Sequence, residues 1–137
     1  MKDVIISIKG LQGTDEDGED IELVTDGDYC FDEKRTAFAY LESELTGMDG
    51  TKTEFKVEPD SVMITRSGTV NMQMLFEEGR KHYFSYETPF GSMTMGVDTQ
   101  SIRNELGEKG GRLEVRYRMD LGYNMVTRNK FEINIKA

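Results

Sequence analysis

The chain has 137 residues, a formal net charge of −9 and one cysteine. A chain of this length forms one ordinary domain around one hydrophobic core, and its negative charge disfavours nucleic acid and anionic membranes as partners. The lone Cys30 cannot form an internal disulfide and no apolar run reaches the length of a signal-peptide core or a membrane helix, so we expect a soluble, cytoplasmic single domain over residues 1–137.

Apolar residues recur at every second position along almost the whole chain, which is the period of a half-buried strand and not of a helix. The amino-terminal segment shows this period at Val4, Ile6 and Ile8. In the middle of the chain, EFKVEPDSVMITRSG (residues 54–68) keeps one apolar phase on both sides of a Glu-Pro-Asp-Ser turn. This stretch predicts a hairpin.

The second half of the chain continues with the same period. Four more segments alternate apolar with polar side chains: TVNMQMLFEEGR (69–80), HYFSYET (82–88), GGRLEVRYRMD (110–120) and NKFEINIKA (129–137). TQSIRNELGEKGG (99–111) is the nearest to a helical pattern. Because Gly107 would end a helix early, we expect a strand there as well.

Roughly nine to eleven such segments, joined by short turn-like clusters, are typical of an all-β sandwich or barrel. Short connections favour pairing in chain order, and about ten strands must either close or leave two exposed edges. The sequence therefore predicts an all-β fold, a closed antiparallel meander barrel of about 8–10 strands. Pro89 and Gly91 fall between two of these strands, and we expect ETPFG (87–91) to form a corner of the barrel.

Seven short motifs follow one another along the chain: YLESELTGMDGTKTEFKV, ITRSG, MLFEEG, YETPFG, VDT, GGRLEVRYRMDL and RNKFEINI. In their order and spacing they resemble the YwiB-like family of small bacterial β-barrels, from about Val4 to Ile135. The resemblance implies a calycin-like, that is lipocalin-like, closed antiparallel barrel in a family of unknown biochemical role, and it implies no catalytic residue. The chain has no tryptophan, so the Gly-x-Trp signature of secreted lipocalins is absent.

Several motifs are explained better by structure than by chemistry. The acidic runs TDEDGED (14–20) and TDGDYCFDE (25–33) lack the spacing of a calcium-binding EF-hand loop, and we expect solvated loops. GMDGTKT (47–53) lacks the Walker spacing and predicts a turn. No defined nucleophile and orienting acid accompany His82, which we expect to be a surface or satisfied core residue. We therefore expect no metal, no cofactor and no catalytic residue.

Three arginines, Arg112, Arg116 and Arg118, alternate along one predicted strand, with Glu114 between them. A basic stripe with interleaved aromatic residues would indicate binding of single-stranded nucleic acid. Tyr117, however, has the inward phase of its strand, so it points away from the arginines. With the acidic net charge, this pattern favours a solvated strand face and no nucleic-acid partner.

Polar side chains in the inward phase are the most informative residues. Glu42, Arg66, Tyr86 and Asn129 each lie two positions from an apolar inward residue, and in a closed barrel they gather inside or at a mouth. A buried charge costs several kcal/mol unless it is paired, so Arg66 requires a carboxylate such as Glu42 or a bound anion. A salt bridge that plugs one end of the barrel and an anchor for a ligand both fit this pattern.

Methionines are frequent in the same phase. Flexible thioethers fill an irregular core or line an adaptable apolar pocket, and core filling is the default. The predicted ligand-binding site comprises nine residues: Glu42, Arg66, Met72, Met74, Tyr86, Met93, Met95, Tyr117 and Asn129.

Two functions fit these observations. The first is a non-enzymatic barrel that binds a small, partly apolar molecule, oriented by the inward polar residues over a methionine-rich wall. The second is an interaction or structural module with a solid, ligand-free core, whose acidic loops or open edge strand contact another protein. An enzyme ranks third, because no residue spacing in the chain requires one.

Overall fold

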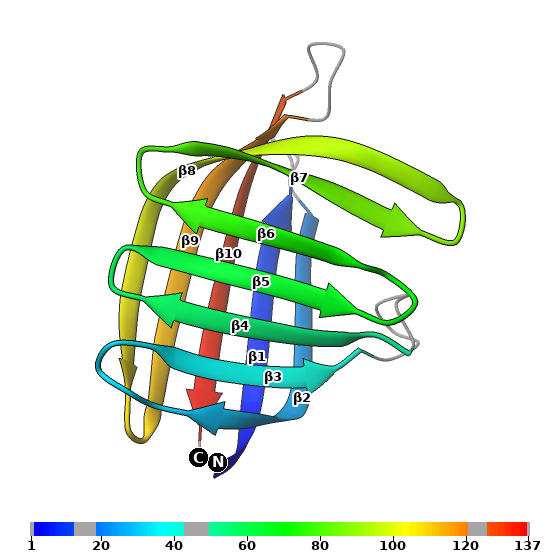
Figure 1. Ribbon diagram of the computed structural model, residues 1–137. Coiled ribbons are helices and arrows are strands. Elements are labelled where there is room, and N and C mark those ends of the chain that lie inside the picture. The colour runs from blue at the N-terminus through cyan, green and yellow to red at the C-terminus, as the bar shows by residue number, and fades with distance from the viewer. Residues whose placement is uncertain (1, 13–18, 43–49, 121–125, 137) are drawn as a thin grey trace.

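The computed structural model describes residues 2–12, 19–42, 50–120 and 126–136, and every helix or strand assigned in them is a β-strand (Figure 1). The strands are β1 (Lys2–Gln12), β2 (Glu19–Cys30), β3 (Thr36–Leu41), β4 (Lys52–Glu58), β5 (Ser61–Ser67), β6 (Met72–Glu77), β7 (Lys81–Thr88), β8 (Gly91–Gly107), β9 (Gly110–Asp120) and β10 (Val126–Lys136). The all-β prediction is confirmed. The described residues contain no helix that is long and apolar enough to cross a membrane.

The ten strands form one antiparallel sheet in the order β6-β5-β4-β3-β2-β1-β10-β9-β8-β7. The first and last strands of the chain lie side by side, because β1 pairs with β10 through eight residue pairs. The two edges of the sheet are β6 and β7. A bridge between Asn71, just before β6, and Glu87 on β7 joins them through two backbone hydrogen bonds of 2.9 Å. The sheet is therefore a nearly closed barrel, as predicted, and its seam lies between two consecutive strands.

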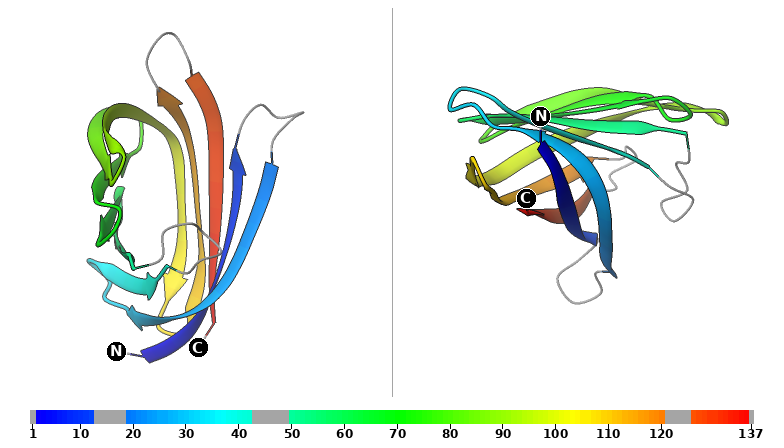
Figure 2. Two further views of the ribbon diagram at one scale, coloured as in Figure 1. Left: turned by 90° about the vertical axis from the view of Figure 1, so that its right-hand side faces the viewer. Right: turned by 90° about the horizontal axis from the view of Figure 1, so that it is seen from below.

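The barrel consists of two layers of strands that cross each other (Figures 1 and 2). The front layer contains β3, β4, β5 and β6, and the back layer contains β1, β2, β10 and β9. At one corner, β2 pairs with β3 only over Asp28–Cys30 and then diverges from it. At the other, the register of β8 against β9 shifts between Thr99 and Ser101, and a bulge of this kind bends a strand.

The prediction of a barrel corner at ETPFG is wrong. β7 and β8 remain paired up to Thr88 and Gly91, so Pro89 and Phe90 form a tight turn at the end of a hairpin. Gly91 has a φ angle of +131°, which glycine adopts at low cost. Proline ends the pairing here without redirecting the sheet, and the chain changes layer at the bulge in β8. The strand expected over residues 99–111 is confirmed by β8 and β9.

Aromatic rings from both layers meet in the interior. Phe38 and Phe55 of the front layer stack with their centroids 4.6 Å apart. Phe76 of the front layer meets Tyr117 of β9 edge-on at 4.9 Å and Phe131 of β10 at 5.5 Å. Aromatic pairs of this geometry contribute about 0.5–1.5 kcal/mol beyond the burial of their surface. The two layers are therefore packed against each other by rings, as the apolar phases predict.

The inward methionines follow the prediction with one exception. Met72, Met74 and Met95 are buried in this core, where they fill space between the rings. Met93 is 52% exposed, so the prediction that it lines the interior is wrong. It shares the phase of Met95 but lies near the end of the β7–β8 hairpin, which extends beyond the neighbouring β6 (Figure 1).

Candidate functional site

The register of the front layer places four inward side chains in one row. Tyr40 on β3 lies opposite Thr53 on β4, Thr53 lies opposite Arg66 on β5, and Arg66 lies opposite Met72 on β6. Directly opposite residues in antiparallel strands have Cβ atoms about 4.5–5.5 Å apart. Glu42 follows Tyr40 by two positions. The pairing thus brings the predicted Glu42 and Arg66 to the same end of the front layer.

Thr53 bridges the two charged groups. Its hydroxyl donates a hydrogen bond of 2.6 Å to Glu42 Oε1 and accepts one of 3.3 Å from Arg66 Nε. Arg66 Nε lies 3.8 Å from the same oxygen of Glu42. The backbone N–H of Glu42 donates to the carbonyl oxygen of Thr51 at 2.8 Å, which extends the β3–β4 pairing past the end of β3. An ion pair between Glu42 and Arg66 is therefore present, with a hydroxyl between its partners.

The hydrogen bonding of this ion pair is incomplete. The Glu42 side chain is 1% exposed, and its Oε2 atom has no hydrogen-bond partner in the described part of the chain. The Arg66 side chain is 23% exposed, and its hydrogen bond and its ion pair with described residues are both made by Nε and not by the two Nη groups. A buried polar atom without a partner costs about 1–3 kcal/mol. The pair consequently offers one buried acceptor and a solvent-accessible guanidinium.

Two tyrosines adjoin this pair. Burial raises the pKa of Tyr40, and the charge of Glu42 raises it further, whereas Arg66 lowers it. Burial also raises the pKa of Tyr117 to about 12, again opposed by the charge of Arg66. Both phenols are therefore neutral at physiological pH and can donate or accept hydrogen bonds. We name Tyr40, Glu42, Thr53, Arg66 and Tyr117 the inner polar cluster.

The other predicted polar residues are placed differently. Asn129 lies directly opposite Tyr117 on β10, and its Nδ2 donates to Thr127 Oγ1 at 3.0 Å. Tyr86 packs against the core on β7, opposite Met93. No hydrogen bond or ion pair among the described residues joins Tyr86 to the inner polar cluster. The structure therefore brings Glu42 and Arg66 together through Thr53. Tyr117, with Asn129 opposite it, is linked to Arg66 only by the effect of the arginine's charge, and Tyr86 lies apart.

The prediction missed Tyr40 and Thr53. A signal for Thr53 was present in the sequence, because Thr51 and Thr53 continue the inward phase of Phe55, and both threonines are 0% exposed in the structure. A hydroxyl in a buried phase needs a hydrogen-bond partner. The carboxylate two positions beyond Tyr40 supplies that partner for Thr53.

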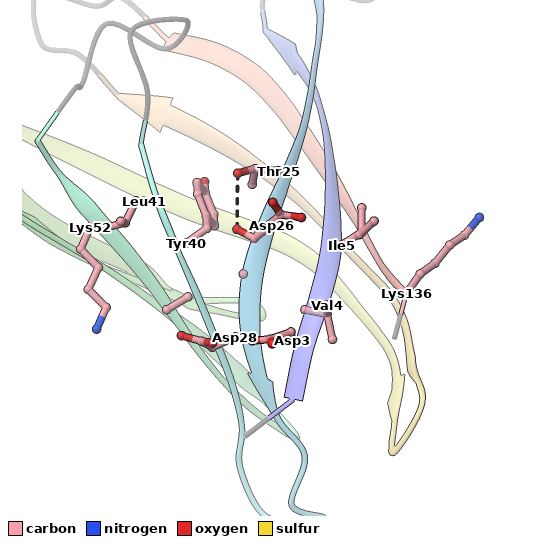
Figure 3. A pocket seen from close by; sticks show the side chains of 12 residues that line it. Asp3, Val4, Ile5, Thr25, Asp26, Asp28, Tyr40, Leu41, Lys52 and Lys136 are labelled. Atoms are coloured by element: carbon pink, nitrogen blue, oxygen red, sulfur yellow. Dashed lines mark hydrogen bonds between the residues drawn. The ribbon is translucent and has the colours of Figure 1, made fainter.

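A cavity of about 820 Å³ lies on the flank of the barrel, where β2 and β3 diverge (Figure 3). Its lining includes Tyr40, the buried Val4 and the exposed Ile5 and Leu41, together with five charged residues: Asp3, Asp26, Asp28, Lys52 and Lys136. Figure 3 shows the Tyr40 ring between β3 and β2. Because Tyr40 belongs both to this lining and to the inner polar cluster, one side chain connects the cavity to the buried ion pair.

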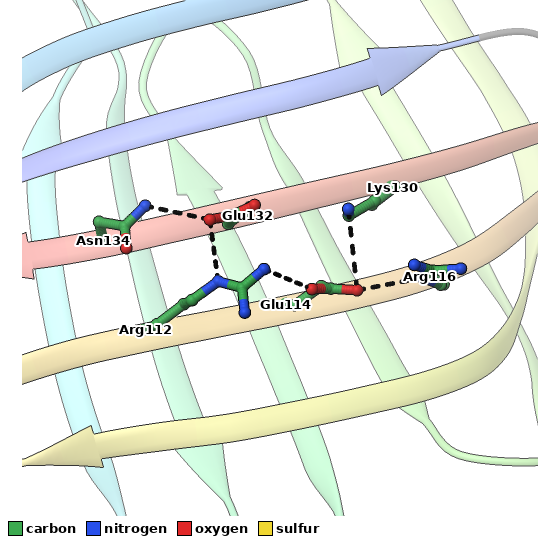
Figure 4. A network of polar contacts seen from close by, with 6 residues as sticks. All are labelled: Arg112, Glu114, Arg116, Lys130, Glu132 and Asn134. Atoms are coloured by element: carbon green, nitrogen blue, oxygen red, sulfur yellow. Dashed lines mark hydrogen bonds and ion pairs between the residues drawn. The ribbon is translucent and has the colours of Figure 1, made fainter. Parts of the chain in front are cut away.

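A second polar network covers the outer face of β9 and β10 (Figure 4). Glu114 is 5% exposed and contacts Arg112 at 2.7 Å, Arg116 at 3.0 Å and Lys130 at 3.9 Å. Burial alone would raise the pKa of Glu114, but the hydrogen bond from Arg116 and the neighbouring cations lower it. Arg112 also binds Glu132 at 2.8 Å. The arginines lie on the outer face, as predicted, while Tyr117 packs inward.

The remaining motifs are His82, the two acidic runs and GMDGTKT. His82 Nε2 lies 3.0 Å from Glu77 Oε1, which agrees with a satisfied side chain. No three His, Cys, Asp or Glu residues within residues 2–12, 19–42, 50–120 and 126–136 are grouped as metal ligands. Most of TDEDGED and the start of GMDGTKT lie outside these ranges, and β4 begins inside GMDGTKT at Lys52. The expectation of a solvated loop at TDGDYCFDE is wrong for its first six residues, which belong to β2 and include the buried Tyr29.

Comparisons with known proteins agree with the fold. Residues 6–133 match the family described as "Domain of unknown function (DUF1934)". The chain is 30% identical over 119 residues to the "Uncharacterized beta-barrel protein YwiB" of Bacillus subtilis, covering 87% of this chain and 82% of that protein. It also superposes on the crystal structure of the ywiB protein from Bacillus subtilis with a TM-score of 0.86 and 27% identity, covering 98% of this chain and 91% of that one. The predicted resemblance to YwiB-like barrels is confirmed.

Proposed function

The chain belongs to the DUF1934 family of unknown function, and on that premise we propose that it is a non-enzymatic, cytoplasmic barrel that binds a small, partly apolar molecule at the inner polar cluster. The observation that carries the proposal is the incomplete Glu42–Arg66 pair: Glu42 Oε2 is buried without a partner, and the Nη groups of Arg66 are reachable from solvent.

The chemistry of this pair defines the ligand's polar end. A guanidinium binds an acceptor such as a carboxylate or carbonyl oxygen, often with two parallel hydrogen bonds. A buried carboxylate oxygen accepts a hydrogen bond from an N–H or O–H group. A ligand that carries both an acceptor and a donor at one end would satisfy Arg66 and Glu42 together, and would remove the cost of the unpartnered oxygen.

The flank cavity supplies space for the apolar part of this ligand. Pockets that bind small molecules have volumes of about 300–1,000 Å³, and the cavity of about 820 Å³ falls in that range. Its lining is more polar than is usual for such pockets, because five of the twelve lining residues are charged. Tyr40 lies between the cavity and Glu42. We infer that the ligand lies against the Tyr40 ring, with its polar end toward the ion pair.

A second candidate is a protein-interaction or structural module with a solid core. It is favoured by the rings of Phe76, Tyr117 and Phe131, which meet across the two layers in the middle of the barrel. This candidate predicts that the Glu42–Arg66 pair serves stability alone. Binding of a small molecule that depends on Arg66 separates the two candidates.

The test is a thermal-shift screen of the purified protein against small amino acids, hydroxy acids, their amides and short aliphatic amines. We expect compounds that carry a donor and an acceptor on an apolar body to raise the melting temperature, because ligands that bind only the folded state stabilise it. Arg66→Met and Glu42→Gln should each abolish the shift. Arg80→Met is the matched control, because Arg80 is an exposed arginine whose contact with Glu77 is 3.9 Å long.

The outcomes are distinct. Shifts that disappear in Arg66→Met and Glu42→Gln but persist in Arg80→Met support the ligand site. A flat response of the wild type to the whole panel, with a stoichiometric protein recovered from cell extract, supports the interaction module. Shifts that survive both cluster variants place binding elsewhere and overturn the proposed site.

A further inference from the structure

The outer face of β9 and β10 carries positive charges in a chain whose net charge is −9. The two strands together contain six arginines and lysines against three acidic residues. Their register places Arg118 directly opposite Arg128, and Arg116 directly opposite Lys130. We name these four residues the cationic quartet. Like charges directly opposite each other on one face of a sheet destabilise it, by up to about 1 kcal/mol a pair.

The quartet is only partly neutralised. Glu114 contacts Arg116 at 3.0 Å and Lys130 at 3.9 Å, and Arg112 shares the same carboxylate. Within the described residues Arg118 and Arg128 form no ion pair or side-chain hydrogen bond, and both are exposed. Their side chains therefore present unused guanidinium donors at the end of the face nearest the 121–125 connection.

We propose that the cationic quartet is a docking surface for an extended acidic segment of a partner protein, with Asp or Glu at alternate positions. Alternate residues of a strand are about 6.8 Å apart and share one face, so the carboxylates of such a segment match the spacing from Arg116 to Arg118 and from Lys130 to Arg128. Arginine binds carboxylates through two parallel hydrogen bonds. The partner would thus supply counter-charges for Arg118 and Arg128, because two neighbouring acidic residues, Glu114 on β9 and Asp98 directly opposite Arg118 on β8, form no ion pair with either arginine in the described residues.

An acidic segment fits this surface better than a nucleic acid does. Proteins that bind single strands add aromatic side chains on which the bases stack, and the only aromatic residues of β9 and β10, Tyr117 and Phe131, both pack into the core. A long polyanion would also extend beyond the quartet, where the net charge of −9 of the chain repels it. A short acidic segment stays close to the quartet, and repulsion from charges farther away than the screening length of about 8 Å is weak at physiological salt.

The experiment uses two fluorescein-labelled ten-residue peptides of the same composition, one with Glu and Thr alternating and one block peptide of the order EETTEETTET, which never places two Glu residues two positions apart. Binding to the full chain is measured by fluorescence anisotropy at low and at physiological salt. We expect the alternating peptide to bind the wild type, and to bind Arg118→Ser/Arg128→Ser at least about tenfold more weakly. Lys34→Ser/Lys56→Ser is the matched control, because it removes two exposed charges elsewhere and should bind like the wild type.

A labelled twenty-residue oligothymidine is measured beside the peptides. The proposal requires the alternating peptide to bind more tightly than both the block peptide and the oligothymidine. It is overturned if the alternating peptide does not bind, if the Arg118/Arg128 variant binds as well as the wild type, or if the block peptide binds equally well. Tighter binding of the oligothymidine would assign the surface to nucleic acid instead. Circular dichroism confirms that each variant is folded.

Discussion

Replacing Arg66 with methionine should destabilise the barrel through Glu42. In the variant, a carboxylate that is 1% exposed would keep one hydrogen bond from Thr53 and lose its nearest cation. Removing one partner of a fully buried ion pair costs about 3–5 kcal/mol. Because Arg66 is 23% exposed and its Nε lies 3.8 Å from Glu42 Oε1, the interaction is weaker than that limit. We expect a loss of about 1–3 kcal/mol in the free energy of unfolding.

The double variant Arg66→Met/Glu42→Gln isolates the pairwise contribution. Glu42→Gln removes the charge but keeps an acceptor for the Thr53 hydroxyl, so it should cost about 1 kcal/mol or less. If the two charges stabilise each other, the double variant loses less free energy of unfolding than the sum of the losses in the two single variants. We expect a coupling energy of about 1–2 kcal/mol.

Urea unfolding followed by circular dichroism measures all four proteins, with equal m-values required for comparison. Arg80→Met is again the control and should change the free energy of unfolding by about 0.5 kcal/mol or less. The reasoning is refuted if Arg66→Met behaves like Arg80→Met and the coupling energy is zero within error. That result would mean that the charges of Glu42 and Arg66 do not stabilise each other in the folded protein.

Three further predictions concern other sites. Burial raises the pKa of Tyr117 from 10.0 to about 12, so the unfolded chain loses its phenolic proton first and the free energy of unfolding falls between pH 10.0 and about 12. Tyr117→Phe should reduce that fall by about 2 kcal/mol, measured by urea unfolding at a series of alkaline pH values. The same dependence of stability on pH in the variant and the wild type would contradict the burial of the phenol. The pKa of Glu114 is lowered, so the stability that its charge contributes is present at neutral pH and is lost as the pH falls through the lowered pKa. Glu114→Gln should be destabilising by about 1 kcal/mol at pH 7, and by less as the pH is lowered; an equal loss at every pH would exclude charge as the cause. Gly111→Ala should cost about 2 kcal/mol or more in thermal unfolding, because φ is +140° and a Cβ atom would clash with the Glu105 carbonyl oxygen. A loss below about 0.5 kcal/mol would show that the β8–β9 turn adapts.

The alternation of apolar residues is sufficient to predict the barrel. A period of two identifies which side chains of a strand face the core, and this assignment does not depend on which strands it pairs with. It predicted that Glu42, Arg66 and Tyr117 face inward, and the pairing of β3, β4 and β5 brings Glu42 and Arg66 together. The alternation does not predict where along its length a strand leaves the barrel. It therefore places Met93 in the interior, whereas Met93 lies near the end of the β7–β8 hairpin and is 52% exposed.

The positions of the corners also required the structure. Proline and glycine in ETPFG indicate only that pairing stops, and a hairpin end and a barrel corner both satisfy that condition. The actual bend depends on one extra residue near Thr99 in β8, which no residue type marks. Likewise, the cross-strand register that opposes Arg118 to Arg128 depends on the length of the β9–β10 connection, and the alternation within each strand does not define it.

The most direct test of the ligand site is the ¹⁵Nε signal of Arg66, followed by NMR while the best stabilising compound of the thermal-shift panel is added, and assigned by its absence from Arg66→Met. If the compound binds at the inner polar cluster, the chemical shift of this signal changes in proportion to occupancy. The change saturates at the same compound concentration as the rise in the melting temperature. An Arg66 signal that stays fixed while the protein is saturated, or a panel in which no compound binds, would contradict the assignment.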